Sequence, residues 1–196
     1  MSSQIYLVWD NAPSVSHDWL TVGPRNTQII HDLRFRLPFA DNSQESVRAY
    51  LCLHRLPYQY SGLYLADWIR VLEPGGCLTV IVPDLEWYLD LYRHTKMPDR
   101  AYFLNTGLYG ENVSGRSAFY HSWFPPQLSW WGCLDCEMSS GITPLLSAHA
   151  RKRSDISTAP AILAGSSLDN LPASPEQIAN YQGYEEWAPP NFAWLS

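Results

Sequence analysis

The chain has 196 residues, which fits one domain of typical size, or one domain with an appendage. Hydrophobic residues make up 46% and charged residues 16%, so a wholly disordered chain is excluded, and no apolar stretch reaches the roughly 20 residues that a membrane span needs. Residues 1–153 are nearly neutral and residues 154–196 contain no Lys or Arg, so no basic surface for nucleic acid is expected. The first residues also lack the features of a secretory signal, so we expect a cytoplasmic protein with no membrane insertion.

The first part of the chain contains four runs that predict strands. Each is rich in apolar or β-branched residues and is bounded by Pro, Gly, Asp or Asn. The runs are residues 5–9, 19–22, 27–31 and 47–53. The segment 37–43, Leu-Pro-Phe-Ala-Asp-Asn-Ser, has the composition of a loop.

From Tyr60 the apolar residues recur every three or four positions, which predicts an amphipathic helix. Pro74 cannot continue the helical hydrogen bonds, and Gly75 supplies the positive φ of a helix exit. The next run, residues 77–82, is apolar on both faces, as expected for a buried strand of a parallel sheet covered by helices. Helix, turn and buried strand indicate an α/β fold.

Three further elements follow. Asp84 is suited to cap a helix with aromatic residues on one side, residues 101–109 have a weaker helical pattern, and residues 125–131 predict a short helix entered through proline. From Ser139 onward no sustained periodicity is visible. We interpret the basic triplet Arg151-Lys152-Arg153 as a solvated junction between a body and a tail.

Residues 154–196 differ in composition from the rest. They carry five acidic residues and no basic one, and residues 154–173 are rich in Ser, Ala, Leu, Pro and Gly. Ser174-Pro-Glu-Gln177 matches a capping box and predicts a short helix start. We therefore divide the chain into a domain, residues 1–153, and an irregular acidic C-terminal arm, residues 154–196.

The chain has four cysteines, of which only Cys133 and Cys136 have the spacing of a metal-binding pair. No second Cys pair or His-x3-His supplies the two further ligands that a structural zinc requires. We expect reduced, partly buried thiols and no metal site.

Several motifs, in order, resemble class I S-adenosylmethionine (SAM)-dependent methyltransferases of the methyltransferase type 11 kind. The most specific is Arg70-Val-Leu-Glu-Pro-Gly-Gly76, similar to the family's R-V-L-K-P-G-G, followed by a strand and Pro83-Asp84-Leu85. Supporting pieces are Asp32-Leu-Arg, segment 37–43, Leu108-Tyr-Gly110 and His121-x-x-Phe124. The resemblance covers about residues 4–136. It implies a Rossmann-like, doubly wound, mostly parallel sheet with helices on both faces.

The segments that would hold the cofactor depart from the family pattern. Val8 and Asp10 stand where the resemblance places glycines, and a β-branched Val8 would crowd the methionine and ribose of SAM. Gly23 stands where the family has an acidic residue that accepts hydrogen bonds from the ribose hydroxyls of SAM. Losing such a hydrogen bond weakens the binding free energy by about 1.5–3 kcal/mol. Asp32 keeps the position that resembles the adenine-contacting acid. His54, which follows the fourth predicted strand, is a candidate general base, or a structural histidine.

Two hypotheses follow. The favoured one is a methyltransferase-like domain that has lost SAM binding, needs no cofactor and acts as a non-catalytic binding or structural subunit of a larger assembly. The alternative is an active SAM-dependent methyltransferase with a divergent cofactor loop, in which Asp32 still holds SAM.

The arm offers a candidate surface for a protein partner. Aromatic residues supply large contact area at low entropic cost, and short Pro-flanked aromatic segments dock in grooves. The candidate partner-binding residues are Tyr181, Tyr184, Trp187, Phe192 and Trp194. The alternative is that the arm folds back over the domain's own exposed apolar face.

Overall fold

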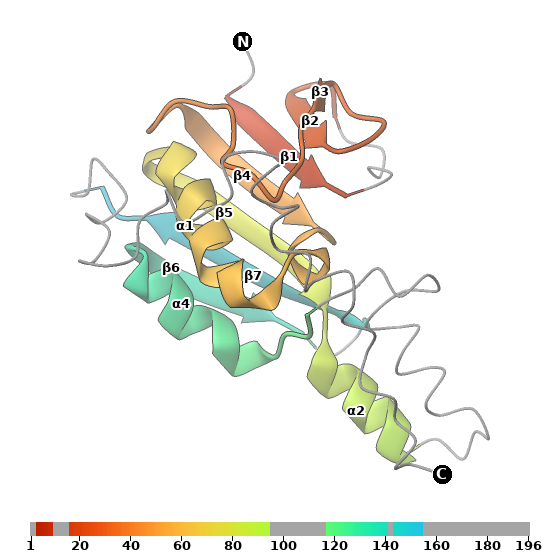
Figure 1. The fold of residues 1–196 in the computed structure, drawn as a ribbon. Coiled ribbons are helices and arrows are strands. Elements are labelled where there is room, and N and C mark those ends of the chain that lie inside the picture. The colour runs from red at the N-terminus through yellow and green to blue at the C-terminus, as the bar shows by residue number, and fades with distance from the viewer. Residues whose placement is uncertain (1–2, 10–15, 95–116, 141–142, 155–196) are drawn as a thin grey trace.

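The computed structural model describes residues 3–9, 16–94, 117–140 and 143–154. These residues form one seven-stranded sheet with helices, drawn in Figure 1. The strands are β1 (Gln4–Val8), β2 (Trp19–Gly23), β3 (Ile29–Ile30), β4 (Gln44–Tyr50), β5 (Leu72–Pro83), β6 (Cys133–Ser139) and β7 (Leu145–Lys152). The α-helices are α1 (Ser61–Val71), α2 (Leu85–His94) and α4 (Phe124–Trp130), with 3-10 turns at Leu53–Arg55, Tyr58–Tyr60 and His121–Trp123.

The strand order is β3-β2-β1-β4-β5-β7-β6. Strands β1 to β5 pair in parallel, and β7 pairs antiparallel with both β5 and β6. The sheet is therefore mostly parallel, and the predicted α/β, Rossmann-like architecture is confirmed. The order reverses between β1 and β4, which is where ligands bind in open α/β sheets.

The main core lies on one face of the sheet. Alternate strand residues such as Leu7, Val47 and Val80 point to this face, are fully buried and belong to one cluster with helix residues such as Trp68 and Leu128. Helices α1 and α4 lie on the same side of the sheet in Figure 1. Among the described residues no α-helix lies on the other face, so the two-sided helical cover implied by the resemblance is not seen in this part of the chain.

The turn after α1 confirms the strongest local prediction. Gly75 has a φ of 84°, and β5 lies inside the sheet between β4 and β7. Opposite this turn the pairing jumps from Gln44–Leu72 to Ser46–Cys77, so residues 73–76 bulge out against Glu45 alone. Strand β5 is not covered on both faces as predicted, because Cys77, Thr79 and Ile81 are only half-buried.

Two helix boundaries are also confirmed. The Asp84 carboxylate accepts hydrogen bonds from the amides of Glu86 (3.0 Å) and Trp87 (3.4 Å) and so caps α2. Helix α4 has proline in its first turn, as predicted. The aromatic side of α2 is half-buried, and no residue of this helix is fully buried.

Three predictions need correction. The strand predicted over residues 47–53 is β4, Gln44–Tyr50, because Leu51 turns into a left-handed conformation (φ 48°) and a 3-10 turn follows. The segment after Ser139, predicted to lack regular structure, contains β7. The triplet at 151–153 is solvated only in part: Arg151 and Arg153 are exposed, but Lys152 is 1% exposed at the end of β7.

Several predictions fall outside the described residues. These are the helical pattern at 101–109, Leu108-Tyr-Gly110, Asp10 and the whole arm from 155 onward. The boundary at residue 153 stays a prediction. No helix among the described residues is long and apolar enough to cross a membrane.

Candidate functional site

The sequence-predicted cofactor positions Val8 and Gly23 lie at neighbouring strand ends. Val8 ends β1 and Gly23 ends β2, and the pairing of Leu7 with Val22 places the two side by side. Val8 also pairs with Tyr50 at the end of β4. These are the carboxyl ends of parallel strands at the point where the strand order reverses, so the fold brings the residues to the expected ligand-binding edge.

The junction of β1 and β2 is tightly closed. A Cβ atom built on Gly23 would lie 2.2 Å from the backbone carbonyl oxygen of Val8, a separation that real side chains do not reach. The Gly23 carbonyl accepts hydrogen bonds from the Thr27 hydroxyl (3.0 Å) and from the His31 amide (2.8 Å), which fix this strand end in place. Val8 itself is 1% exposed. An acidic side chain at position 23 has no room in this geometry.

Asp32 is engaged by a neighbouring arginine. Its carboxylate accepts from the Arg34 guanidinium, with Nη2 at 2.6 Å from Oδ2 and Nε at 3.0 Å from both oxygens. The Arg34 backbone amide also donates to Oδ1, at 3.0 Å. Both carboxylate oxygens of Asp32, which would be needed to contact adenine, thus already accept hydrogen bonds from Arg34 in a local turn.

His54 is buried in the 3-10 turn after β4. Burial, with a smaller contribution from Arg55, lowers the pKa of His54 to about 3. The backbone carbonyl of His54 accepts from the Ser117 amide at 3.0 Å, and its buried Nδ1 has no hydrogen-bond partner among the described residues. An imidazole with so low a pKa is a weak base near neutral pH, so the geometry favours the structural interpretation of His54.

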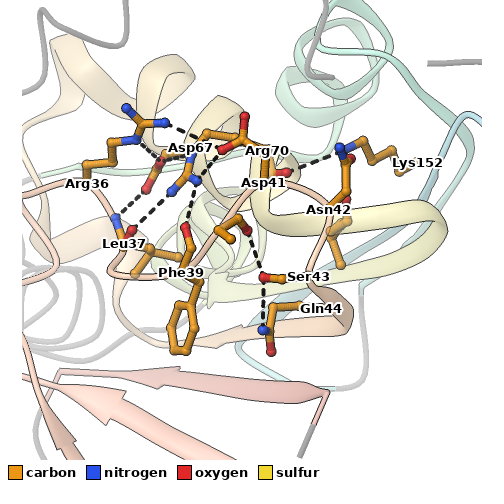
Figure 2. Close-up of polar contacts among 12 residues, drawn as sticks. Arg36, Leu37, Phe39, Asp41, Asn42, Ser43, Gln44, Asp67, Arg70 and Lys152 are labelled. Carbon is orange, nitrogen blue, oxygen red and sulfur yellow. Dashed lines mark hydrogen bonds and ion pairs between the residues drawn. The ribbon is translucent and has the colours of Figure 1, made fainter. Parts of the chain in front are cut away.

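The two best-matching family motifs meet in a buried polar cluster, shown in Figure 2. The Arg70 guanidinium donates to Asp67 (2.8 Å), Asp41 (2.7 Å) and the carbonyls of Phe39 (2.8 Å) and Leu37 (3.0 Å). The second Asp67 oxygen accepts from the Leu37 amide at 2.7 Å. The cluster therefore fastens segment 37–43 to α1.

Lys152 extends this cluster from the last strand. Its Nζ donates to the carbonyl of Leu72 (2.6 Å) and to Asn42 Oδ1 (2.7 Å), with the Arg70 carbonyl at 3.4 Å. Burial lowers the pKa of Lys152. The ammonium group thus joins the ends of α1 and segment 37–43 to β7, a role that the sequence did not signal.

A cavity of about 470 Å³ lies beside α2, at the end of β5. Its lining is acidic and aromatic: Asp84, Glu86, Trp87, Asp90, Leu91, His94 and Ser140. The sequence singled out Asp84 only as a helix cap, which it is. Glu86, Asp90 and His94 were not predicted as site residues, because spaced acids on an exposed helix face carry no specific signal.

The Cys133 and Cys136 thiols do not form a metal centre with other described residues. No group of three or more His, Cys, Asp or Glu residues among them is arranged to hold a metal ion. Cys133 is buried, and burial raises its pKa to about 12. Cys136 is half-buried against the core.

No family model matches the sequence, and no curated protein does either. Solved structures share the fold. A protein of Bacillus halodurans C-125 that bears a provisional methyltransferase name has a TM-score of 0.51 and 11% identity, covering 78% of this chain and 93% of that one. A SAM-dependent methyltransferase of Archaeoglobus fulgidus has a TM-score of 0.50 and 8% identity, covering 68% and 76%.

A third protein, from Bordetella parapertussis and provisionally designated as exported, has a TM-score of 0.50 and 11% identity, covering 77% of this chain and 62% of that one. Identities this low establish shared architecture and not shared chemistry. The mostly parallel sheet, its strand order and these likenesses together show that the chain has the fold of class I SAM-dependent methyltransferases.

Proposed function

We propose that this protein is a methyltransferase-like domain that has lost SAM binding and acts as a non-catalytic binding or structural subunit of a larger assembly. The observation that carries the proposal is the contact of Gly23 with the Val8 carbonyl, where an added Cβ would lie at 2.2 Å. The ribose-binding acid is missing, and the backbone leaves no room for one. The proposal keeps the cytoplasmic location predicted from the sequence.

The pattern of kept and lost motifs supports this proposal. The family-like residues Asp41 and Arg70 both serve the buried cluster, in which Arg70 also pairs with Asp67. The positions that face the ligand edge depart from the family or are engaged elsewhere, as Asp32 is by Arg34. A chain under pressure to keep its fold, and not its cofactor, would retain this set.

The arm completes the proposal. Its candidate partner-binding residues, Tyr181, Tyr184, Trp187, Phe192 and Trp194, lie outside the described residues and are proposed to contact a partner protein. Large aromatic side chains dominate binding energy in protein interfaces.

Calorimetric titration of the purified protein with SAM and with S-adenosylhomocysteine tests the loss of cofactor binding. We expect no dissociation constant below about 10 μM, which corresponds to roughly −7 kcal/mol. Tight binding would support the alternative, an active enzyme with a divergent loop.

The Asp32→Asn variant separates the two hypotheses further. If Asp32 holds the adenine, this variant should weaken SAM binding by roughly tenfold or more, since a charge-assisted hydrogen bond is lost. In the non-catalytic protein the variant leaves the titration unchanged. Circular dichroism of both proteins confirms that each is folded.

A further inference from the structure

The second face of the sheet, opposite α1 and α4, has the composition of an interface. Along each strand, every second side chain points to the core, and the side chains between them point to this second face. The pairing of the strands aligns these side chains in rows across β2, β1, β4, β5 and β7. None of them belongs to the main core cluster. We call this surface the open face; it comprises residues that are at least partly exposed, whereas Tyr6 and Val8 on the same side of the sheet are buried. Its residues are Trp19, Thr21, Ile30, Ser46, Arg48, Tyr50, Cys77, Thr79, Ile81, Leu134, Glu137, Ser147, His149 and Arg151.

Short connections explain why no helix of the described chain covers the open face. Parallel strands β1 and β2 are joined by residues 9–18, and β2 and β3 by residues 24–28. A crossover that carries a helix needs a dozen residues or more. These connections are too short to add a helical layer over β1, β2 and β3.

Aromatic and aliphatic side chains occupy the open face. The partly exposed rings of Trp19 and Tyr50 lie 5.9 Å and 6.1 Å from the ring of Tyr6, which is itself 3% exposed. Toward the two sheet edges, Ile30 is 77% exposed and Leu134 is 50% exposed. Exposed apolar side chains grouped on one face of a sheet are candidates for an interaction site.

The charges of the open face are mainly positive. The Arg48 guanidinium lies 5.0 Å from the centre of the Trp19 ring, and its buried Nε has no hydrogen-bond partner in the part of the chain that the structure describes. Arg151 is exposed, beside Cys77 in the sheet. Glu137, paired with His149, is the acidic side chain of this face. One guanidinium group over an aromatic ring and a second on the strand β7 fit an acidic segment that carries aromatic residues.

The chain itself contains such a segment. Residues 155–196 follow directly after β7, whose Arg151 lies on the open face, and residues 174–196 carry Glu176, Glu185 and Glu186 with no basic residue. The intervening residues 155–173 span up to roughly 60 Å when extended, enough to reach any part of the sheet. Tethering raises the effective concentration of the segment to the millimolar range.

We propose that residues 174–196 dock on the open face of their own chain. Their carboxylates lie against Arg48 and Arg151, and their aromatic side chains pack on Trp19 and Tyr50. This inference deepens the part of the proposed function that concerns the arm. Because the same aromatic residues serve the proposed partner contact, docking on the open face and binding a partner exclude one another.

Cys77 is a natural probe of this contact, because its thiol belongs to the open face and is half-buried. The experiment measures the alkylation rate of Cys77 by N-ethylmaleimide in the full chain, using peptide mass spectrometry. The charge reversal E185K/E186K should raise the Cys77 rate at least threefold, and so should Arg151→Glu. Cys136, which packs against the core on the other side, serves as the internal reference and should not change.

Combining Arg151→Glu with E185K/E186K should restore protection of Cys77, which a merely destabilised protein would not show. The matched control reverses two charges on α2, E86K/D90K, and should leave the rate at its wild-type value. Unchanged labelling of Cys77 in E185K/E186K would overturn the proposal. Light scattering checks the occupant: protection that weakens on dilution, with a dimeric mass, would assign the segment to a second copy and overturn docking within one chain. SAM titration is independent of both results.

Discussion

Arg70 begins the motif that most resembles the methyltransferase family, and it is also the centre of the buried polar cluster. Its side chain is 3% exposed, and Asp67, its ion-pair partner, is 2% exposed. A buried guanidinium is tolerated only when its donors are satisfied, and here they meet two carboxylates and two carbonyls. Arg70 and its partners therefore have a structural role in the described domain.

Replacing Arg70 should be among the most damaging single changes. We expect Arg70→Ala to lower the free energy of unfolding by about 3–5 kcal/mol, because it leaves the buried Asp67 with only the half-exposed Arg36, at 3.9 Å, as an ion-pair partner. Urea denaturation measures the change. Arg93→Ala is the control, since the Arg93–Asp90 pair at 3.5 Å is about two-thirds exposed on both sides, and it should cost less than about 1 kcal/mol. Equal effects of the two variants would show that the cluster does not hold the fold.

At the scale of elements, the junction of β1 and β2 is the feature on which the proposed loss of SAM binding depends. The two strands pair in parallel. Because Gly23 has no side chain, the end of β2 can lie directly against the backbone of Val8 at the end of β1. Gly75, in the bulge at the start of β5, meets nothing within 4 Å and is needed only for its positive φ. One glycine serves close packing and the other serves backbone conformation.

These two glycines give a matched pair of substitutions. Gly75→Ala should cost about 1–2 kcal/mol, the price of a left-handed conformation in a residue with a Cβ. Gly23→Ala should cost more than about 3 kcal/mol, because the backbone of Val8 must move. Thermal and urea unfolding of both variants provide the comparison. A smaller loss of stability at Gly23 than at Gly75 would mean that the ends of β1 and β2 separate easily. It would contradict the inference that position 23 has no room for a side chain.

At the scale of the whole molecule, the described domain is a sheet with its main core on one side and the open face on the other. The core face is filled by α1, α4 and the turns around His54. The enclosure of His54 gives the stability of the whole domain a predictable dependence on pH.

The pKa of His54 lies near 3 in the folded protein, below its usual 6.5, so the unfolded chain takes up a proton that the folded chain refuses. The contribution of His54 to stability is therefore full above pH 6.5 and is lost as the pH falls from 6.5 toward 3. We expect a slope of up to about 1.4 kcal/mol per pH unit in that window. Urea unfolding of wild type and His54→Gln at several pH values isolates this slope, since other groups contribute to both. His121→Gln, at an exposed histidine, is the control. Parallel pH profiles for wild type and His54→Gln would contradict the buried, neutral state of His54.

Much of the local structure could be predicted from the sequence. The helix over 61–71, the turn at Gly75, the cap at Asp84 and the proline entry of α4 all depend on neighbours along the chain. The candidate cofactor positions Val8 and Gly23 also lie where the resemblance placed them, at adjacent strand ends. The roles of Asp32 and His54 in binding or catalysis stay predictions.

The sequence by itself determined the class of the fold and the local boundaries, because proline, glycine and capping residues act within a few positions. Only the tertiary structure decided that residues 145–152 form a strand, since their inward side chains are Leu146, Ala148, Ala150 and Lys152, a weak pattern that becomes stable when paired with β5. It also decided that Lys152 is buried, because its three oxygen partners come from segments that are far apart in the chain. The closure of Gly23 on Val8 has the same origin: contacts between distant residues exist only after the strands have assembled.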